Sequence, residues 1–200
     1  MRTAKAKAVK VPVGMATIIA ALGDNWMIRT SDDGKAYGGF KWGAIGVWTT
    51  APDWNCDPTC GGGLHGQGPR GFGYAHEQGS RIEFCETKGT RIVVGGDKIK
   101  VQHARILWVG QDAITALRFA VKGKFPGSLR LYGTISLAGF KEIGGYVLAY
   151  QDAKIDLPQC TSVGGYVWAD KDAKIDLPQC TSVGGYVLAY QDAKIDLPQC

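Results

Sequence analysis

Three cysteines and one histidine in the front half of the chain are residue types that bind metal ions or act as nucleophiles. Cys56, Cys60 and His65 are close in sequence, and Cys85 follows them. A Cys-x3-Cys pair with a nearby histidine falls within the spacing of zinc sites. A second closely spaced pair is missing from the sequence. We therefore expect no cofactor, and zinc held by these four residues is the alternative.

A nucleophile pair formed by Cys60 and His65 is the enzymatic alternative. A thiolate needs a nearby base or a helix N-terminus to activate it. No third group can be assigned to orient the histidine, although Asp53, Asp57 and Glu77 are candidates. The three glycines after Cys60 lack the Gly-Lys-Ser/Thr ending of a phosphate-binding loop, so they predict a turn. We assign no catalytic residue, and the prediction leans toward a protein that is not an enzyme.

The last third of the chain is built from a repeat of twenty residues. Copies end at Cys160, Cys180 and Cys200, and residues 183–200 differ from residues 143–160 only in carrying Val183 for Ile143. Inside each copy the residues alternate with the period of a half-buried strand, and Gly-Gly and Leu-Pro pairs mark corners. Twenty residues are too few for a helix–turn–helix repeat. The sequence predicts a parallel β-solenoid of about four coils over residues 123–200, its first coil shorter than the others.

Equivalent residues of a parallel solenoid stack about 4.8 Å apart, so each repeated position forms a row. The rows expected to point inward are Val147/Val167/Val187, Ile155/Ile175/Ile195, Leu157/Leu177/Leu197, Phe140/Cys160/Cys180/Cys200 and Ile143/Val163/Val183. One coil cannot bury its own apolar edge, so stability is expected to come from stacking. The cysteines are expected to be free thiols packed as small apolar residues.

The outward face of the same strands is the predicted binding site. Three outward columns are expected: Tyr146/Tyr166/Tyr186, Leu148/Trp168/Leu188 and Tyr150/Asp170/Tyr190. A contiguous aromatic patch marks a contact surface, and Tyr and Trp are enriched at binding hot spots. We name Tyr146, Tyr150, Tyr166, Trp168, Tyr186 and Tyr190 as binding residues. The alternative is that the front domain or a second copy of the chain covers this face.

The last coil predicts a second contact. The pattern stops at Cys200 without a polar cap, whereas solenoids need capped ends and open strand edges pair readily. We expect this coil to meet a partner or a second protomer edge to edge, giving a homo-oligomer.

The front part of the chain predicts a strand-rich α+β domain over residues 24–122, after a basic flexible arm over 1–23. Strands are expected at 25–30, 81–85, 90–94, 98–102 and 105–109, and one short helix at 112–121. Residues 1–144 contain 19 Lys and Arg against 11 Asp and Glu, while residues 145–200 contain 4 against 7. A basic front half suits contact with nucleic acid, an acidic protein or anionic lipid. No segment is long and apolar enough to cross a membrane, and none of the expected partners is a membrane.

The repeat resembles the receptor L-domain family. The stretch Leu-Pro-Gln-Cys-Thr-Ser-Val-Gly-Gly-Tyr-Val at 157–167 follows that family's unit, with cysteine in place of a leucine, and similar Leu-Thr-Ser-Val-Gly-Gly arrays occur in phage and bacterial proteins. This resemblance covers about residues 127–200. It implies right-handed coils of the L-domain or leucine-rich-repeat type and says little about a ligand.

The front domain resembles an uncharacterised phage and prophage family. The resemblance rests on Gly-Phe-Lys-Trp at 39–42, Ala-Pro-Asp-Trp at 51–54 and Cys-Gly-Gly-Gly-Leu-His-Gly at 60–66, and it covers about residues 37–120. Cys56 departs from the family pattern. The resemblance implies a phage or prophage accessory factor that binds a host protein or nucleoprotein, for example to inhibit a host defence complex as anti-CRISPR proteins do. A virion-surface or structural solenoid module is the other alternative.

The cysteine pattern favours the cytoplasm of the host cell. Half of the six cysteines are explained by repeat position, so they do not form a secreted disulfide framework, and a reducing compartment is the simpler interpretation. Basic residues before the apolar stretch 11–22 resemble a signal peptide, which leaves export as the alternative.

Overall fold

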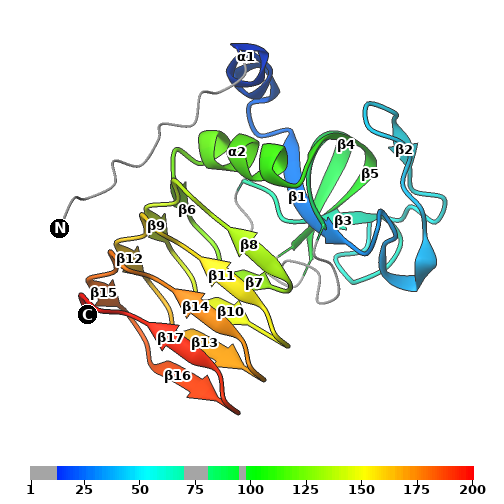
Figure 1. Ribbon diagram of the computed structural model, residues 1–200. Helices are drawn as coiled ribbons and strands as arrows, with labels where there is room; N and C mark the ends of the chain where they lie inside the picture. Colours follow the sequence, from blue (N-terminus) through cyan, green and yellow to red (C-terminus); the bar gives the residue numbers. More distant parts are fainter. Residues whose placement is uncertain (1–12, 70–80, 95–97) are drawn as a thin grey trace.

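The computed structural model describes residues 13–69, 81–94 and 98–200, and it contains a front α/β region followed by a parallel β-solenoid (Figure 1). The solenoid has roughly four turns, as the repeat predicts, and extends from about residue 124 to residue 196. Residues 1–12, which carry most of the expected basic arm, lie outside the described residues.

The front region is organised around one antiparallel sheet. Its strands are β1 (Trp26–Ser31), β2 (Thr49–Thr50), β3 (Leu64–Gly66), β4 (Arg81–Val94) and β5 (Lys98–Val109), with a 3-10 turn η1 (Tyr37–Gly39) between β1 and β2. The sheet runs β1-β4-β5-β2, and β3 also pairs with β5. Ile28 of β1 exchanges two backbone hydrogen bonds with Gln67, directly after β3, and this pairing closes the sheet into a small barrel.

Two long strands replace the four short ones expected between residues 81 and 109. β4 and β5 form one hairpin, and their register shifts between Phe84 and Cys85 and again between Lys88 and Arg91. Such irregularities bend a strand and increase its twist, which a sheet needs in order to close. The polar and apolar residues stop alternating after residue 85, where the sequence predicted a strand end. The structure has a shift of register near this point, and the strand continues through it.

Two helices lie beside the barrel. α2 (Gln111–Ala120) matches the expected helix to within one residue at each end and buries Ala113, Ile114, Ala116 and Leu117. α1 (Val13–Leu22) is a helix where the sequence analysis expects part of a flexible arm, so that expectation is wrong for these residues. Pro12 directly before the helix suits a helix start, and Met15 and Leu22 are buried against the rest of the domain.

The solenoid consists of three parallel four-stranded sheets. Their strands, in chain order, are β6 (Lys124–Phe125), β7 (Leu129–Leu131), β8 (Thr134–Ser136), β9 (Glu142–Ile143), β10 (Val147–Ala149), β11 (Lys154–Asp156), β12 (Ser162–Val163), β13 (Val167–Asp170), β14 (Lys174–Asp176), β15 (Ser182–Val183), β16 (Val187–Tyr190) and β17 (Lys194–Asp196). One sheet contains β7, β10, β13 and β16, the second β8, β11, β14 and β17, and the third β6, β9, β12 and β15.

The register of these sheets confirms the inward rows expected from the repeat. Val147 pairs with Val167 and then Val187, and Ile155 pairs with Ile175. Cys160 and Cys180 are fully buried, and the described structure contains them as free thiols. The rows of the last coil are more exposed, because no further coil stacks on it among the described residues.

Each coil turns three corners between its strands, and two of them make special demands on the backbone. At the Gly-Gly corner, a side chain on Gly164 would place its Cβ 2.3 Å from the carbonyl oxygen of Gly144, so backbone packs on backbone there. At the opposite corner, Gln151 and Asp152 both have positive φ, and the amide of Ala153 bonds to the carbonyl of Tyr150. That pattern belongs to a type I′ turn, which favours Gly and Asn, so each of the last three coils carries mild backbone strain.

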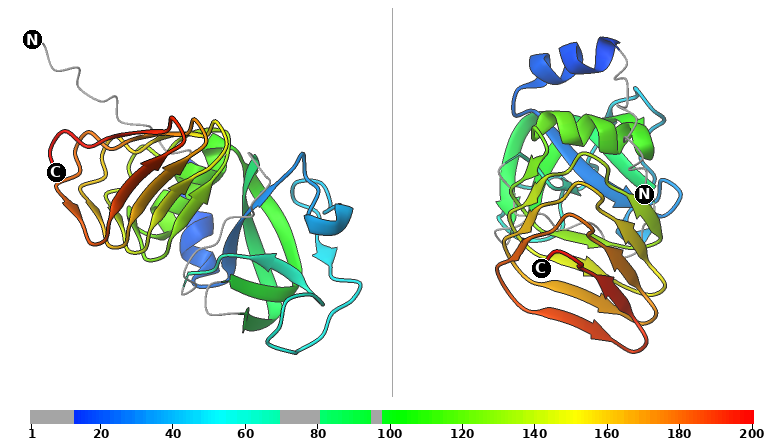
Figure 2. Two further views of the ribbon diagram at one scale, coloured as in Figure 1. Left: turned by 90° about the horizontal axis from the view of Figure 1, so that it is seen from below. Right: turned by 60° about the vertical axis from the view of Figure 1, so that its left-hand side comes forward.

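The front region covers the first end of the solenoid. A continuous apolar core extends from α1 and α2, through Trp26 and Phe84 of the barrel wall, into the interior of the coils. Figure 2 shows the helices and the barrel at the end of the solenoid opposite to the C-terminal coil. The barrel therefore acts as the cap that a solenoid requires at this end.

None of the helices within the described ranges is both long enough and apolar enough to span a bilayer.

Candidate functional site

The tyrosines of the Gly-Gly-Tyr corners form a ladder of stacked rings along one edge of the sheet that contains β10, β13 and β16. Tyr146 and Tyr166 stack with their ring centroids 4.8 Å apart and an interplanar angle of 11°. Tyr166 and Tyr186 repeat the arrangement at 4.8 Å and 7°. Burial raises the pKa of the Tyr166 hydroxyl in the middle of the column, so this hydroxyl stays neutral at physiological pH. The result is a row of flat, partly exposed rings.

The second outward column differs from the expectation at one position. The register places Leu148, Trp168 and Leu188 side by side, as expected. Leu188 is exposed and Trp168 is half-buried, but Leu148 is buried, so the prediction of an exposed leucine there is wrong. Leu148 lies in the row between the longer side chains of Arg130 and Trp168, which shield it from solvent.

The third column has a polar break in its centre. Asp170 pairs with Tyr190 on one side and follows Tyr150 in the repeat on the other. One carboxylate oxygen of Asp170 and the indole nitrogen of Trp168 are both buried, and neither has a hydrogen-bond partner within the described part of the chain. Their two residues face the same side of β13, so the middle coil places an acceptor and a donor at the centre of an aromatic surface.

The first coil extends this surface with two residues that the sequence analysis does not include. Tyr132 stacks on Tyr150 with ring centroids 5.6 Å apart, and the guanidinium of Arg130 lies 5.2 Å from the ring centroid of Tyr150. The sequence does indicate their positions, because the first coil is two residues shorter than the others. Leu129 therefore pairs with Val147, and Arg130 pairs with Leu148. We define the aromatic face as Arg130, Tyr132, Tyr146, Leu148, Tyr150, Tyr166, Trp168, Asp170, Tyr186, Leu188 and Tyr190.

The cysteines of the zinc alternative lie in different environments. Cys56 and Cys60 are exposed on the loop before β3, whereas Cys85 is fully buried in the barrel core. Burial raises the pKa of the Cys85 thiol well above its usual range. Within residues 13–69, 81–94 and 98–200, no three His, Cys, Asp or Glu side chains are grouped so that they could hold a metal ion.

The histidine of the enzymatic alternative is a weak base. Burial, followed by the positive charges of Lys98 and Lys100, lowers the pKa of His65 to about 4, so the ring is neutral near pH 7. A base of that strength does little to form a thiolate at Cys60. Glu77, one of the candidate orienting groups, lies outside the described residues.

The glycine turn after Cys60 has a structural explanation. The ammonium of the buried Lys100 donates to Asn55 Oδ1 at 2.7 Å and to the carbonyl of Gly61 at 3.1 Å. Gly61 and Gly62 both have positive φ, and a Cβ on Gly62 would collide with the Asn55 side chain. The run of glycines therefore lets the loop close around Lys100 and lets Leu64 enter the core, which fits the expected turn.

The aromatic face is thus the largest group of predicted site residues that the structure brings together. It contains all six residues named from the sequence, and these come from three successive coils and stack in register. Comparison of the chain with protein-family models, with curated proteins and with solved structures gave no match.

Proposed function

We propose that this chain is a non-enzymatic interaction protein that binds a protein partner through the aromatic face. The observation that carries the proposal is the column of stacked tyrosines, continued to the exposed Tyr186, Leu188 and Tyr190 of the last coil. Flat aromatic rings held by their neighbours lose little conformational entropy on binding, which is why Tyr and Trp contribute strongly at interfaces.

The distribution of sequence differences among the coils supports the same proposal. The middle coil departs from the first and the third at Trp168, Asp170 and Lys171, and at no inward position of those strands. Val167 and Ala169, which point into the core between these residues, are the same in all three copies. Packing does not require the changes, so they serve the outer surface, where they give the centre of the face its own shape and polarity.

The biological setting follows from the resemblances alone. The motifs at 39–42, 51–54 and 60–66 support a phage or prophage accessory factor, and a host protein or nucleoprotein as its partner. Inhibition of a host defence complex is a role that suits such a factor. The Leu-Pro and Gly-Gly spacing supports right-handed coils of the receptor L-domain type.

A capture experiment tests the proposal. The tagged protein is incubated with bacterial lysate, with and without nuclease, and bound proteins are compared among variants. We expect a partner retained by the wild type and by Gln179→Ala, an exposed residue of the same coil outside the aromatic face, and lost in Trp168→Ala and Tyr166→Ala. Circular dichroism confirms that each variant is folded.

The enzymatic alternative makes the opposite prediction. If capture is unchanged in the two aromatic variants, while Cys60→Ser or His65→Ala abolishes the biological effect in a folded protein, the proposal is wrong. Loss of the captured partner on nuclease treatment alone would show that nucleic acid, and not the protein partner, contacts the chain.

A further inference from the structure

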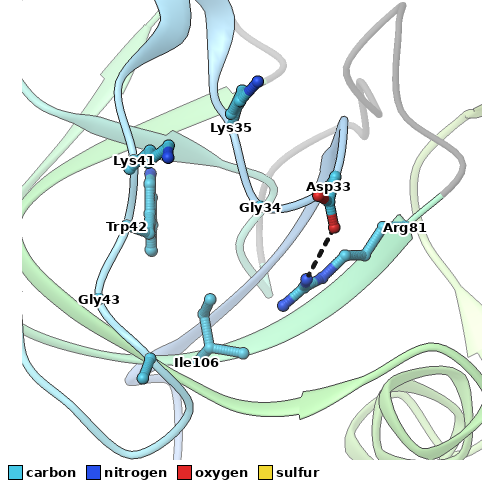
Figure 3. Close-up of a pocket in the computed structure, with 9 residues that line it drawn as sticks. Asp33, Gly34, Lys35, Lys41, Trp42, Gly43, Arg81 and Ile106 are labelled. Atoms are coloured by element: carbon cyan, nitrogen blue, oxygen red, sulfur yellow. Dashed lines mark ion pairs between the residues drawn. The ribbon is translucent and has the colours of Figure 1, made fainter.

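A pocket at one mouth of the barrel lies apart from the aromatic face. It is lined by the turn after β1, the loop after η1, the start of β4 and Ile106 of β5, and its volume is about 260 Å³ (Figure 3). The lining residues are Asp33, Gly34, Lys35, Lys41, Trp42, Gly43, Ala44, Arg81 and Ile106. Figure 3 shows Arg81 and Trp42 reaching toward this space from opposite sides.

The lining is cationic. Lys35, Lys41 and Arg81 contribute three positive charges, and Asp33 contributes the one negative charge. Asp33 is almost fully exposed and lies 3.9 Å from Arg81, so water screens this pair and the pocket keeps an excess of positive charge. A small anion is the ligand that this charge attracts.

Buried charges lie beneath the pocket. The carboxylate of Glu83 has no exposed surface, and it forms ion pairs of 3.0 Å with Arg29 and 2.9 Å with Arg81. It also accepts a hydrogen bond from Ser31 at 2.9 Å. One carboxylate therefore faces two guanidinium groups, so the cluster itself is positive.

Arg29 is the part of this cluster that the fold does not satisfy. Its side chain is 4% exposed, and both terminal nitrogens of the guanidinium are buried with no hydrogen-bond partner among the residues that the structure describes. The guanidinium lies 4.0 Å from the ring centroid of Trp42, and Trp42 is a wall of the pocket. Burying a cation with unpaired donors is unfavourable for stability, and such exceptions concentrate at functional sites.

We propose that this pocket binds one nucleotide, with its phosphate on Arg81 and Lys41 and its base against Trp42. A guanidinium matches the geometry of phosphate oxygens, and a lysine adds a point charge. A tryptophan ring gives a base a surface on which to stack. The volume lies just below the range of about 300–1,000 Å³ that is usual for larger ligands, which favours a single nucleotide unit.

The nucleotide can be free or part of a single strand, and both present the same groups. The two sources differ outside the pocket, because a strand places further phosphates beyond it and a free nucleotide does not. Binding of a strand then falls more steeply with added salt, since each further phosphate contact releases counterions.

Calorimetric titration of the full chain tests the proposal with four probes: AMP, adenosine, inorganic phosphate and a five-residue oligoadenylate. We expect AMP to bind at least about tenfold more tightly than adenosine or phosphate, because only AMP uses both the cationic and the aromatic wall. Equal affinity of AMP and the oligonucleotide identifies a free nucleotide, and tighter, salt-sensitive binding of the oligonucleotide identifies a strand.

Variants connect the binding to the pocket. Lys41→Gln changes an exposed side chain, and we expect it to weaken AMP binding about tenfold without affecting the fold. Trp42→Leu is expected to weaken AMP more than phosphate. Lys154→Gln removes an equivalent exposed charge from the solenoid and should change nothing. The proposal is wrong if no probe binds at millimolar concentration, or if Lys41→Gln and Arg81→Gln both bind AMP as the wild type does.

Discussion

The barrel and the solenoid fill their interiors in different ways. The solenoid stacks apolar residues at the same positions of successive coils, and its inward rows contain no charged residue. The barrel holds an apolar core around Met27 and Cys85, and then places Arg29 and Glu83 on the same strands toward one mouth. The repeated part is therefore specialised on its surface, whereas the barrel is specialised in its interior, where it holds buried charges.

Removal of the buried carboxylate is the strongest test of that contrast. Glu83→Gln leaves two guanidinium groups facing one another without a counter-charge, and we expect a loss of about 3–5 kcal/mol in the free energy of unfolding. Urea denaturation measures it. Glu86→Gln is the matched control, because Glu86 pairs with Arg105 nearer the surface and should cost less than about 1 kcal/mol. If the two variants lose the same free energy of unfolding, the buried carboxylate is not more important to the barrel than an ion pair near its surface.

The second test compares two identical positions of the solenoid. Leu177 is fully buried between coils, while Leu197 occupies the same place in the more exposed last coil. We expect Leu177→Ala to lower the free energy of unfolding by about 2–5 kcal/mol, and Leu197→Ala by clearly less. Thermal denaturation followed by circular dichroism gives both values. If the losses are the same, stacking between neighbours is not the source of solenoid stability.

The third test concerns the strained corners of the coils. Lys171 has φ of 51°, a conformation that glycine adopts without strain. Lys171→Gly is expected to stabilise the chain by about 0.5–1 kcal/mol. Lys174→Gly, in strand β14 three residues later, should instead destabilise it by a similar amount. A melting temperature that falls in both variants would contradict the strain.

The smallest expected effects are on the pH dependence of stability, which differs between the barrel and the solenoid. The pKa of His65 in the barrel is lowered to about 4 from 6.5, chiefly by burial, so the unfolded chain takes up the proton first and stability falls as pH drops from about 6.5 to 4. The pKa of Cys160 in the solenoid is raised to about 11 from 9.0, again chiefly by burial, so the unfolded chain loses the proton first and stability falls as pH rises from about 9 to 11.

Denaturation curves across pH measure these slopes. His65→Gln should flatten only the acidic side of the stability profile, and Cys160→Ala only the alkaline side. A variant whose profile stays parallel to that of the wild type would show that the residue is equally accessible in both states.

The two regions also differ in how far the sequence predicts them. The twenty-residue period determines both the coils and the row to which each side chain belongs, because parallel stacking repeats the same environment. The prediction failed at Leu148, whose burial depends on Arg130 in the shorter first coil. The six aromatic residues named from the sequence lie together for the same reason.

The barrel was predicted less well, since its pairings join distant residues. Arg29 and Glu83 look like solvent-facing positions of amphipathic strands, and only the closure of the sheet places them inside. The lining of the pocket comes from four separate segments, so no local pattern indicates it. The sequence offered one indication of the buried ion pair: Arg29 and Glu83 are oppositely charged residues in two of the predicted strands.

The tyrosine ladder has a consequence for how this protein can change. Because the inward residues of the three full copies are apolar at every repeated position and the rings repeat every 4.8 Å, insertion or removal of one twenty-residue unit keeps every remaining row in register. The solenoid can therefore become longer or shorter by whole coils while the spacing of its rings stays constant. The length of the aromatic face that meets a target would change by one coil at a time, and the barrel that caps the first coil would not change.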